Sequence, residues 1–391
     1  MGILSTNVLK RETLNALKYL GGSGSLYEID RRVIDAIDLP IDVVQQPNSN
    51  RPSQTQLQYR LAWSRTKLRL DGLIENSSPK IWTLTPLGKT EPEQQGPIPY
   101  STEDVLKEGV FLTLPDVEAI IGRMNLKRNV ILQGAPGVGK TFVTRKLAYA
   151  LMGAKDDSKI TVVQFHPSYS YEDFVRGYRP TDEAGRFEMK DGPFLEICEA
   201  AYSEPDEKFV IIVDEINRGN LSQVFGEMFS LLEGDKRGRS NEVTPLYRRS
   251  VDDRVSVPGN LFVIGTMNIA DRSLALVDYA LRRRFAFITL EPQFKSPAYR
   301  DWLTSRGMEE ILVNRIITSM TALNEKITED RQLGRAYQIG HSFFCPPGEE
   351  FSTLGLDWFD GIIKTEIRPL LEEYWFDEPE KVEAAFSQVL G

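Results

Sequence analysis

A glycine-rich segment between a predicted strand and a predicted helix constrains the fold most strongly. The strand is Asn129–Gln133 (NVILQ), the segment is GAPGVGKT at residues 134–141, and FVTRKLAYALMG continues as a helix. Glycines let the backbone curl until its N–H groups converge, and the N-terminus of the following helix adds a favourable dipole. The pattern GxxxxGK[ST] between a strand and a helix therefore predicts a loop that binds phosphates.

Each position of this loop has an expected role. Lys140 is expected to reach the β- and γ-phosphates, and Thr141 is expected to hold Mg²⁺. The residues expected to surround the phosphates are Gly134, Ala135, Pro136, Gly137, Val138, Gly139, Lys140 and Thr141.

Two other predicted strands end in residues suited to nucleotide hydrolysis. The run FVIIVDE at 209–215 is apolar until its last two residues, as a buried parallel strand with chemistry at its carboxyl end should be. Asp214 is expected to support Mg²⁺, and Glu215 to polarise the attacking water. A strand at 261–266 leads to Asn268, which is expected to orient that water and the γ-phosphate.

A predicted helix at 274–285 ends in the basic cluster Arg282, Arg283 and Arg284. Such a cluster can simply complement the helix dipole. The stronger interpretation is an arginine finger, which stabilises the triphosphate of a neighbouring subunit and therefore implies a ring. Together with predicted strands at 160–165 and 286–290, these segments give an α/β AAA+ P-loop NTPase with a five-stranded parallel sheet and a helical lid.

The N-terminal segment has the order of a winged helix. Helical patterns at 8–20, 26–37 and 55–70 precede two short β-prone runs, GLIEN and KIWTLT. Winged helices lay the third of these helices in the major groove. The basic residues expected to contact DNA are Arg51, Arg60, Arg65, Lys67, Arg69 and Lys80. A solvated basic face, or a winged helix that binds protein, is the alternative.

Prolines and a glycine then interrupt every periodic pattern, which is typical of a linker. The expected domains are a winged helix at 1–93, a linker at 94–104, a large α/β subdomain at 105–291 and a helical lid at 292–391.

The net charge of −9, from 47 basic and 56 acidic residues, is unevenly distributed. Residues 1–90 carry twelve basic and eight acidic residues, so this part is +4 and the remainder is −13. The acidic average therefore does not exclude DNA binding at the N-terminal end. Two cysteines and two histidines are too few for a disulfide framework or a dedicated zinc centre. With so few cysteines, a reducing cytoplasm is the expected location. No apolar window reaches the length of a membrane span.

Several sequence blocks resemble the McrB family, the AAA+ subunits of McrBC-type modification-dependent restriction systems. These blocks are VVQFHPSYSYEDFVRGYRP, DEINRGN, TMNIADRSLALVDYALRRRF, IGHSFF and EIRPLLEEYW. The segment YRLAWSRTKLRLDGLIENSSPKIWTLTPLGK is similar to the N-terminal domain of the Mrr family of restriction proteins.

The resemblance implies a hexameric GTP-hydrolysing ring that controls a separate McrC-like nuclease on modified DNA. By position it makes Arg283 and Arg284 the finger candidates, and it gives Arg218, Asp271 and Arg272 supporting roles at the subunit interface. GTP rests on the resemblance alone, because the chain lacks an NKxD element, and ATP stays open. The alternative function is an ATP-dependent, DNA-bound AAA+ regulator or remodeller without a nuclease partner.

Three other features are weaker. Asp182 with Glu188 and Lys190 superficially matches a Mg²⁺-dependent nuclease, but the segment also fits a β-hairpin. His166 and His341 are expected to be packed structural residues. The basic loop at 234–250 fits a pore-facing element or a solvated hairpin equally well.

Overall fold

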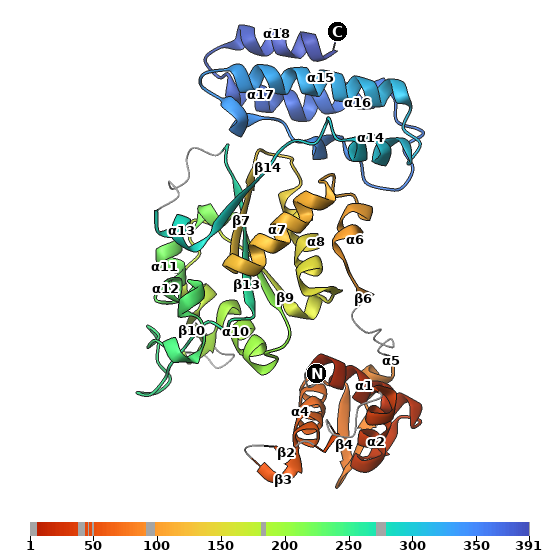
Figure 1. Cartoon of the computed structure of the whole chain (residues 1–391), viewed down its shortest axis with the longest axis vertical. Coiled ribbons are helices and arrows are strands. Elements are labelled where there is room, and N and C mark those ends of the chain that lie inside the picture. Colours follow the sequence, from red (N-terminus) through yellow and green to blue (C-terminus); the bar gives the residue numbers. More distant parts are fainter. Residues whose placement is uncertain are drawn as a thin grey trace. The chain divides into compact units, whose positions relative to one another are not determined.

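The computed structural model describes residues 6–37, 44–45, 47–48, 51–90, 98–180, 185–270 and 279–390 (Figure 1). The chain divides into two compact units. One comprises residues 1–98 together with 200–207, and the other comprises 99–199 and 208–391.

The N-terminal unit is built from three helices and a small antiparallel sheet. The helices are α1 (Thr6–Tyr19), α2 (Leu26–Ile37) and α4 (Gln56–Leu70), and the sheet has the order β1-β5-β4, with strands Ser23–Ser25, Ile81–Leu84 and Ile74–Ser78. Helix α4 starts at a capping box in which Thr55 and Gln58 satisfy each other's backbone N–H groups. Leu9, Leu17, Ile29 and Leu61 are fully buried between these elements. The predicted winged-helix order is confirmed.

Short strands also occur in the connections between these elements. Before α4, β2 (Pro47–Asn48) pairs with β3 (Arg51–Thr55). Within the expected linker, β6 (Ile98–Pro99) pairs with β8 (Ala154–Lys155), and α6 (Thr102–Lys107) begins after a Ser101 cap. The structured part of the nucleotide-binding unit therefore begins before residue 105.

A five-stranded parallel sheet with the order β14-β7-β13-β12-β9 forms the centre of the second unit. Its strands are Ala286–Leu290, Asn129–Gly134, Leu261–Asn268, Phe209–Asp214 and Ile160–Gln164. All five predicted strands are confirmed. The three middle strands are buried along almost their whole length, which requires cover on both faces.

Helices provide that cover. Figure 1 shows α7 (Leu114–Lys127) and α8 (Lys140–Met152) on one face of the sheet and α11 (Leu221–Phe225) and α12 (Met228–Leu231) on the other. Helix α10 (Pro193–Ser203) follows a hairpin formed by β10 (Arg176–Pro180) and β11 (Phe187–Asp191). Each parallel strand thus delivers its carboxyl end to one edge, where loops are free to hold functional groups.

The C-terminal helices form a lid with a core of its own. They are α14 (Pro297–Thr304), α15 (Glu310–Glu329), α16 (Leu356–Ile362), a π-helical turn at Ile363–Ile367, α17 (Arg368–Tyr374) and α18 (Pro379–Leu390). Ile316, Leu323 and Phe359 lie at the centre of this core. Among the described helices, none has the length and apolar character to cross a membrane.

Candidate active site

The predicted phosphate loop has the backbone shape that such a loop requires. Gly137 and Gly139 have φ values of 75° and 77°, a left-handed conformation that favours glycine. The Lys140 Nζ donates to the carbonyl oxygens of Gly134 and Ala135, at 3.0 and 2.9 Å. Burial lowers the pKa of Lys140, while the nearby Glu215 and Asp214 oppose that shift. A partly buried cation at the N-terminus of helix α8 (Lys140–Met152) suits a polyphosphate.

Asp214 lies beside this loop at the end of β12. Thr141 Oγ1 is 3.3 Å from Asp214 Oδ1, and the Thr266 hydroxyl donates to the same oxygen. Thr266 Oγ1 in turn accepts from the backbone N–H of Glu215, at 3.1 Å. A hydroxyl and a carboxylate are oxygen ligands of the kind that Mg²⁺ prefers, so Thr141 and Asp214 fit the metal role predicted for them. Sequence reasoning missed Thr266, because a threonine within an apolar strand is common.

Glu215 adopts an unusual backbone conformation, with φ 52° and ψ 46°. Left-handed backbone is strained for a residue with a long side chain, and such strain concentrates at functional sites. Arg218 Nε lies 3.4 Å from Glu215 Oε2. The conformation turns the chain sharply after β12, directly beside Asp214.

Asn268 ends the neighbouring strand β13 and stands in register with Gly134 of β7. Its Oδ1 accepts from the backbone N–H of Ala270, at 3.3 Å. The sheet order places β13 between β7 and β12, so Asn268 lies between the strand that leads into the phosphate loop and the strand that carries Asp214. The predicted catalytic residues on these strands are therefore brought to one edge of the sheet.

The arginines at the end of α13 (Tyr279–Arg284) differ sharply from one another. The Arg283 side chain is 73% exposed, with its guanidinium 3.2 Å from a Glu233 oxygen. The Arg284 side chain is only 14% exposed, lies 3.0 Å from the other Glu233 oxygen, and stacks on Phe229. Glu233 itself is buried. The expectation that Arg284 acts as a finger is therefore corrected: its guanidinium is packed inside its own subunit.

A buried polar network anchors this helix end to the sheet. Asn129, the first residue of β7, donates to the carbonyl oxygens of Leu232 and Arg284, at 2.7 and 3.0 Å. The side-chain oxygen of Asn129 accepts from the buried Arg237, at 2.5 Å. Sequence reasoning missed Asn129, Glu233 and Arg237 as partners because they are far apart along the chain.

The lid contacts the phosphate loop through backbone hydrogen bonds. The Gly340 N–H donates to Pro136 O at 2.9 Å, and the Ser342 N–H donates to Gly137 O at 2.8 Å. A β-carbon at Gly340 would lie within 2.3 Å of the backbone of Gly137 and Val138, so only glycine fits there. This contact, which we call the lid clasp, explains why the IGHSFF block belongs to the site.

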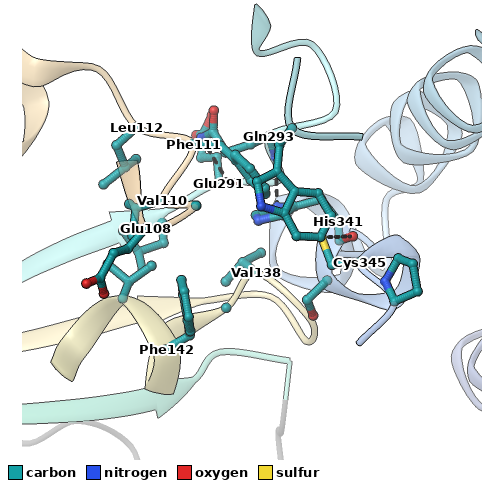
Figure 2. Close-up of a pocket in the computed structure, with 17 residues that line it drawn as sticks. Glu108, Val110, Phe111, Leu112, Val138, Phe142, Glu291, Gln293, His341 and Cys345 are labelled. Carbon is teal, nitrogen blue, oxygen red and sulfur yellow. Dashed lines mark hydrogen bonds between the residues drawn. The ribbon is translucent and has the colours of Figure 1, made fainter. Parts of the chain in front are cut away.

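A cavity of about 310 Å³ opens beside the phosphate loop, within the size range of small-ligand pockets (Figure 2). Val138 and Gly139 of the loop, Phe142 of α8, Phe111 before α7 and His341 of the lid contribute to its wall. An apolar cavity that continues from a phosphate-binding loop is suited to the base of a nucleotide. The sequence did not reveal this cavity, because its walls come from five separate segments.

Among the residues predicted to contact DNA, the structure contradicts Arg65. Its side chain is 6% exposed and forms an ion pair with Asp30 of α2. Lys67, Arg69 and Lys80 are exposed, and Arg60 is half-buried. The side chain of Arg51 lies outside the described residues. Arg65 therefore stabilises the packing of α4 on α2 and is not part of a DNA-binding face.

The residues that superficially match a nuclease do not form a metal site among the described residues. Glu188 and Lys190 form an exposed ion pair at 2.5 Å on β11, as a solvated hairpin would, while Asp182 lies outside the described residues. Asp271 and Arg272 also lie outside them. In the parts of the chain that the structure describes, no cluster of three metal-binding side chains occurs.

Comparison with known proteins agrees with this architecture. Residues 129–285 match the AAA domain of the dynein-related subfamily, and residues 315–383 match the McrB α-helical lid domain. Residues 8–92 match the Mrr N-terminal domain. The chain is thus an AAA-type P-loop NTPase with an Mrr-type N-terminal domain.

Two relatives are restriction proteins. The chain is 45% identical over 320 residues to the type IV methyl-directed restriction enzyme EcoKMcrB subunit of Escherichia coli, covering 82% of this chain and 67% of that protein. It is 29% identical over 260 residues to the type II restriction enzyme BsuMI component YdiS of Bacillus subtilis, covering 57% and 75%. The chain belongs to the McrB family.

Proposed function

We propose that this chain is a GTP-hydrolysing, ring-forming subunit of a modification-dependent restriction system. In this role it binds DNA through its N-terminal unit and controls a separate McrC-like nuclease. The observation that carries the nucleotide part of the proposal is the convergence of Lys140, Thr141, Asp214 and Glu215 at one sheet edge, beside a cavity sized for a small ligand.

In the proposed reaction, the loop N–H groups and Lys140 bind the phosphates and stabilise charge as it develops on the γ-phosphoryl group. A Mg²⁺ ion held by Thr141 and Asp214 would neutralise phosphate charge when bound. Glu215 polarises the attacking water, and Asn268 orients it. The left-handed backbone turn at Glu215 and the hydrogen bond from its N–H to Thr266 fix the position of the Glu215 backbone, from which the carboxylate extends.

The exposure of Arg283 supports the proposed ring. Its guanidinium is exposed at the end of α13, on a helix anchored by Asn129 and by the Arg284–Glu233 ion pair. An exposed cation on a rigid element is suited to reaching the triphosphate of a neighbouring subunit. By homology with McrB we propose a hexamer, with Arg283 as the finger that acts in trans.

The DNA and nuclease parts of the proposal rest on the relatives and on α4. Lys67 and Arg69 are exposed near the end of this helix, where a winged helix meets the phosphate backbone. The two relatives are named as components of restriction enzymes, which supports a partner nuclease.

Turnover of GTP and ATP by the purified chain, alone and with a McrC-like partner, is the most direct test. We expect GTP turnover that the partner increases. ATP turnover without GTP turnover in either mixture would refute the GTP assignment and favour an ATP-dependent regulator. Lys140→Ala should abolish turnover, whereas Glu215→Gln should retain nucleotide and stop hydrolysis.

The trans role of Arg283 needs mixed rings. Arg283→Ala and Lys140→Ala subunits are each expected to be inactive alone, because one lacks the finger and the other lacks the phosphate-binding lysine. Mixing them should create some interfaces that hold both groups and so restore part of the activity. No restoration in rings shown to contain both subunits would contradict a finger in trans.

A further inference from the structure

His341 occupies a position in the cavity wall that its sequence block did not reveal. It begins a 3₁₀ turn at His341–Phe344, directly after Gly340 of the lid clasp. Only 7% of the residue is exposed, yet it lines the cavity beside the phosphate loop (Figure 2). A buried polar ring facing a ligand-sized cavity calls for an account of its hydrogen bonds.

The imidazole is held rigidly. Its ring makes edge contacts with Phe111, Phe294 and Tyr299, with ring centroids 5.2, 6.4 and 5.8 Å away. The backbone N–H of Gln293 donates to Nδ1 at 3.1 Å, and Figure 2 shows this hydrogen bond beside the cavity. Three aromatic neighbours and one backbone donor leave the ring no freedom to turn.

The hydrogen bond from Gln293 also fixes the tautomer. A ring nitrogen that accepts from a backbone N–H cannot carry a proton of its own, so in neutral imidazole the proton is on Nε2. Burial lowers the pKa of His341 to about 4, which keeps the ring neutral near pH 7. No other residue in the described ranges accepts a hydrogen bond from Nε2. The cavity wall therefore carries a fixed N–H donor.

A fixed donor distinguishes purines at position 6. Guanine has an acceptor, O6, at that position, whereas adenine has an amino group, which is itself a donor. If the Nε2–H group faced the adenine amino group in a buried site, neither donor would have an acceptor, and leaving both unpaired would cost binding free energy.

We propose that His341 is a specificity-determining residue that selects 6-oxopurine nucleotides by donating from Nε2 to O6 of the base. This inference rests on the proposed function, in that the cavity holds the base of the nucleotide substrate. It adds a residue and an atom that account for a preference for GTP in a chain without an NKxD element.

Two substitutions separate the two ring nitrogens. His341→Asn retains an acceptor near the position of Nδ1, so the Gln293 hydrogen bond survives, but it removes the distal donor. His341→Gln places an amide donor near the position of Nε2. Gly355→Ala is the control, since Gly355 lies in the same lid but not in the cavity wall, and a β-carbon there would have no atom within 4 Å.

The experiment measures the dissociation constants of GTP and of 2-aminopurine riboside triphosphate, which lacks O6, for the full-length chain with Mg²⁺. In the native chain we expect GTP to bind at least tenfold more tightly, since the analogue leaves a buried donor unpaired. His341→Asn should reduce this ratio about tenfold, His341→Gln should restore part of it, and Gly355→Ala should leave it unchanged. A loss of folded protein weakens both nucleotides equally, so the ratio reports the contact itself.

The outcomes separate this inference from the proposed function. If the native chain binds ATP more tightly than GTP, the proposed GTP preference fails, whatever His341 does. If the native chain prefers GTP and His341→Asn leaves the ratio unchanged, the role of His341 is refuted. 7-Deaza-GTP, which lacks N7, tests the other acceptor on the same edge of guanine. If His341→Asn abolishes the preference for GTP over 7-deaza-GTP and not the preference over the 2-aminopurine analogue, the donor contacts N7 and the proposed contact with O6 is wrong.

Discussion

Replacing Gly340 by alanine tests whether the lid clasp supports nucleotide binding. The native φ and ψ at Gly340, −77° and 159°, suit alanine, so the substitution introduces no backbone strain of its own. The new β-carbon, however, would stand 1.9 Å from Gly137 C, 2.0 Å from Gly137 O and 2.3 Å from Val138 N. These are backbone atoms of the phosphate loop, so no side chain can rotate away to relieve the collision.

The lid must therefore retreat from the loop and lose the hydrogen bonds of the clasp, at 2.9 and 2.8 Å. At about 1 kcal/mol for each hydrogen bond, the loss is about 2 kcal/mol, or roughly 30-fold in the docking equilibrium. Because the lid contributes His341 to the cavity wall, nucleotide affinity should fall by a similar factor.

Isothermal titration with GTP and with ATP measures this effect, and Gly355→Ala is the control. Gly355 lies in the same lid at φ −127°, and a β-carbon there would have no atom within 4 Å, so alanine should be harmless. Equal affinities for the Gly340→Ala and Gly355→Ala chains would refute the reasoning. Thermal unfolding of both chains shows whether the lid core remains intact.

Buried charges and the buried imidazole of His341 give three further predictions. Arg65→Ala should destabilise the N-terminal unit by about 3 kcal/mol in chemical unfolding, because it leaves the Asp30 carboxylate without its ion-pair partner. Lys67→Ala should leave the stability unchanged and lower the salt dependence of DNA binding. Arg284→Ala should lower the melting temperature, because it removes the buried ion pair with Glu233. Arg283→Ala, at an exposed side chain, should lower kcat and leave the melting temperature unchanged. The reverse pattern would make Arg284 the finger and Arg283 the structural residue. His341 has a folded pKa of about 4 against an ordinary value of 6.5, so its contribution to stability is complete above pH 6.5 and is lost as the pH falls towards 4. The loss amounts to about 3 kcal/mol in the native chain and should be absent from His341→Asn, as unfolding measured between pH 7 and 4 would show.

The nucleotide-binding core was predictable because its chemistry is local. The phosphate loop, Asp214, Glu215 and Asn268 each lie at the carboxyl end of a strand, and the rule that parallel strands deliver their carboxyl ends to one edge brings them together. The five strands were likewise evident, since each is a short apolar run bounded by polar residues or glycine.

The remaining features depend on contacts between distant segments. Arg65 looked like a surface residue because it is basic, but it falls on the buried stripe of α4 defined by Leu57, Leu61 and Leu68. Its partner Asp30 is 35 residues away, so only the packing of two helices reveals the pair. Arg283 and Arg284 are adjacent in the sequence and both lie close to Glu233, but Arg284 also packs over Phe229, a neighbour that the sequence does not predict, and this packing distinguishes the buried side chain from the exposed one.

With the role in hydrolysis proposed for Glu215, its left-handed backbone places stability and activity in opposition at a single residue. With φ 52° and ψ 46°, this position is more comfortable for glycine or asparagine than for glutamate, by about 1 kcal/mol. Selection for hydrolysis must therefore continually hold glutamate against a drift towards more relaxed residues. A descendant released from that selection, for example one retained only to assemble with active subunits, is expected to accumulate glycine or asparagine here and to gain stability as it loses turnover.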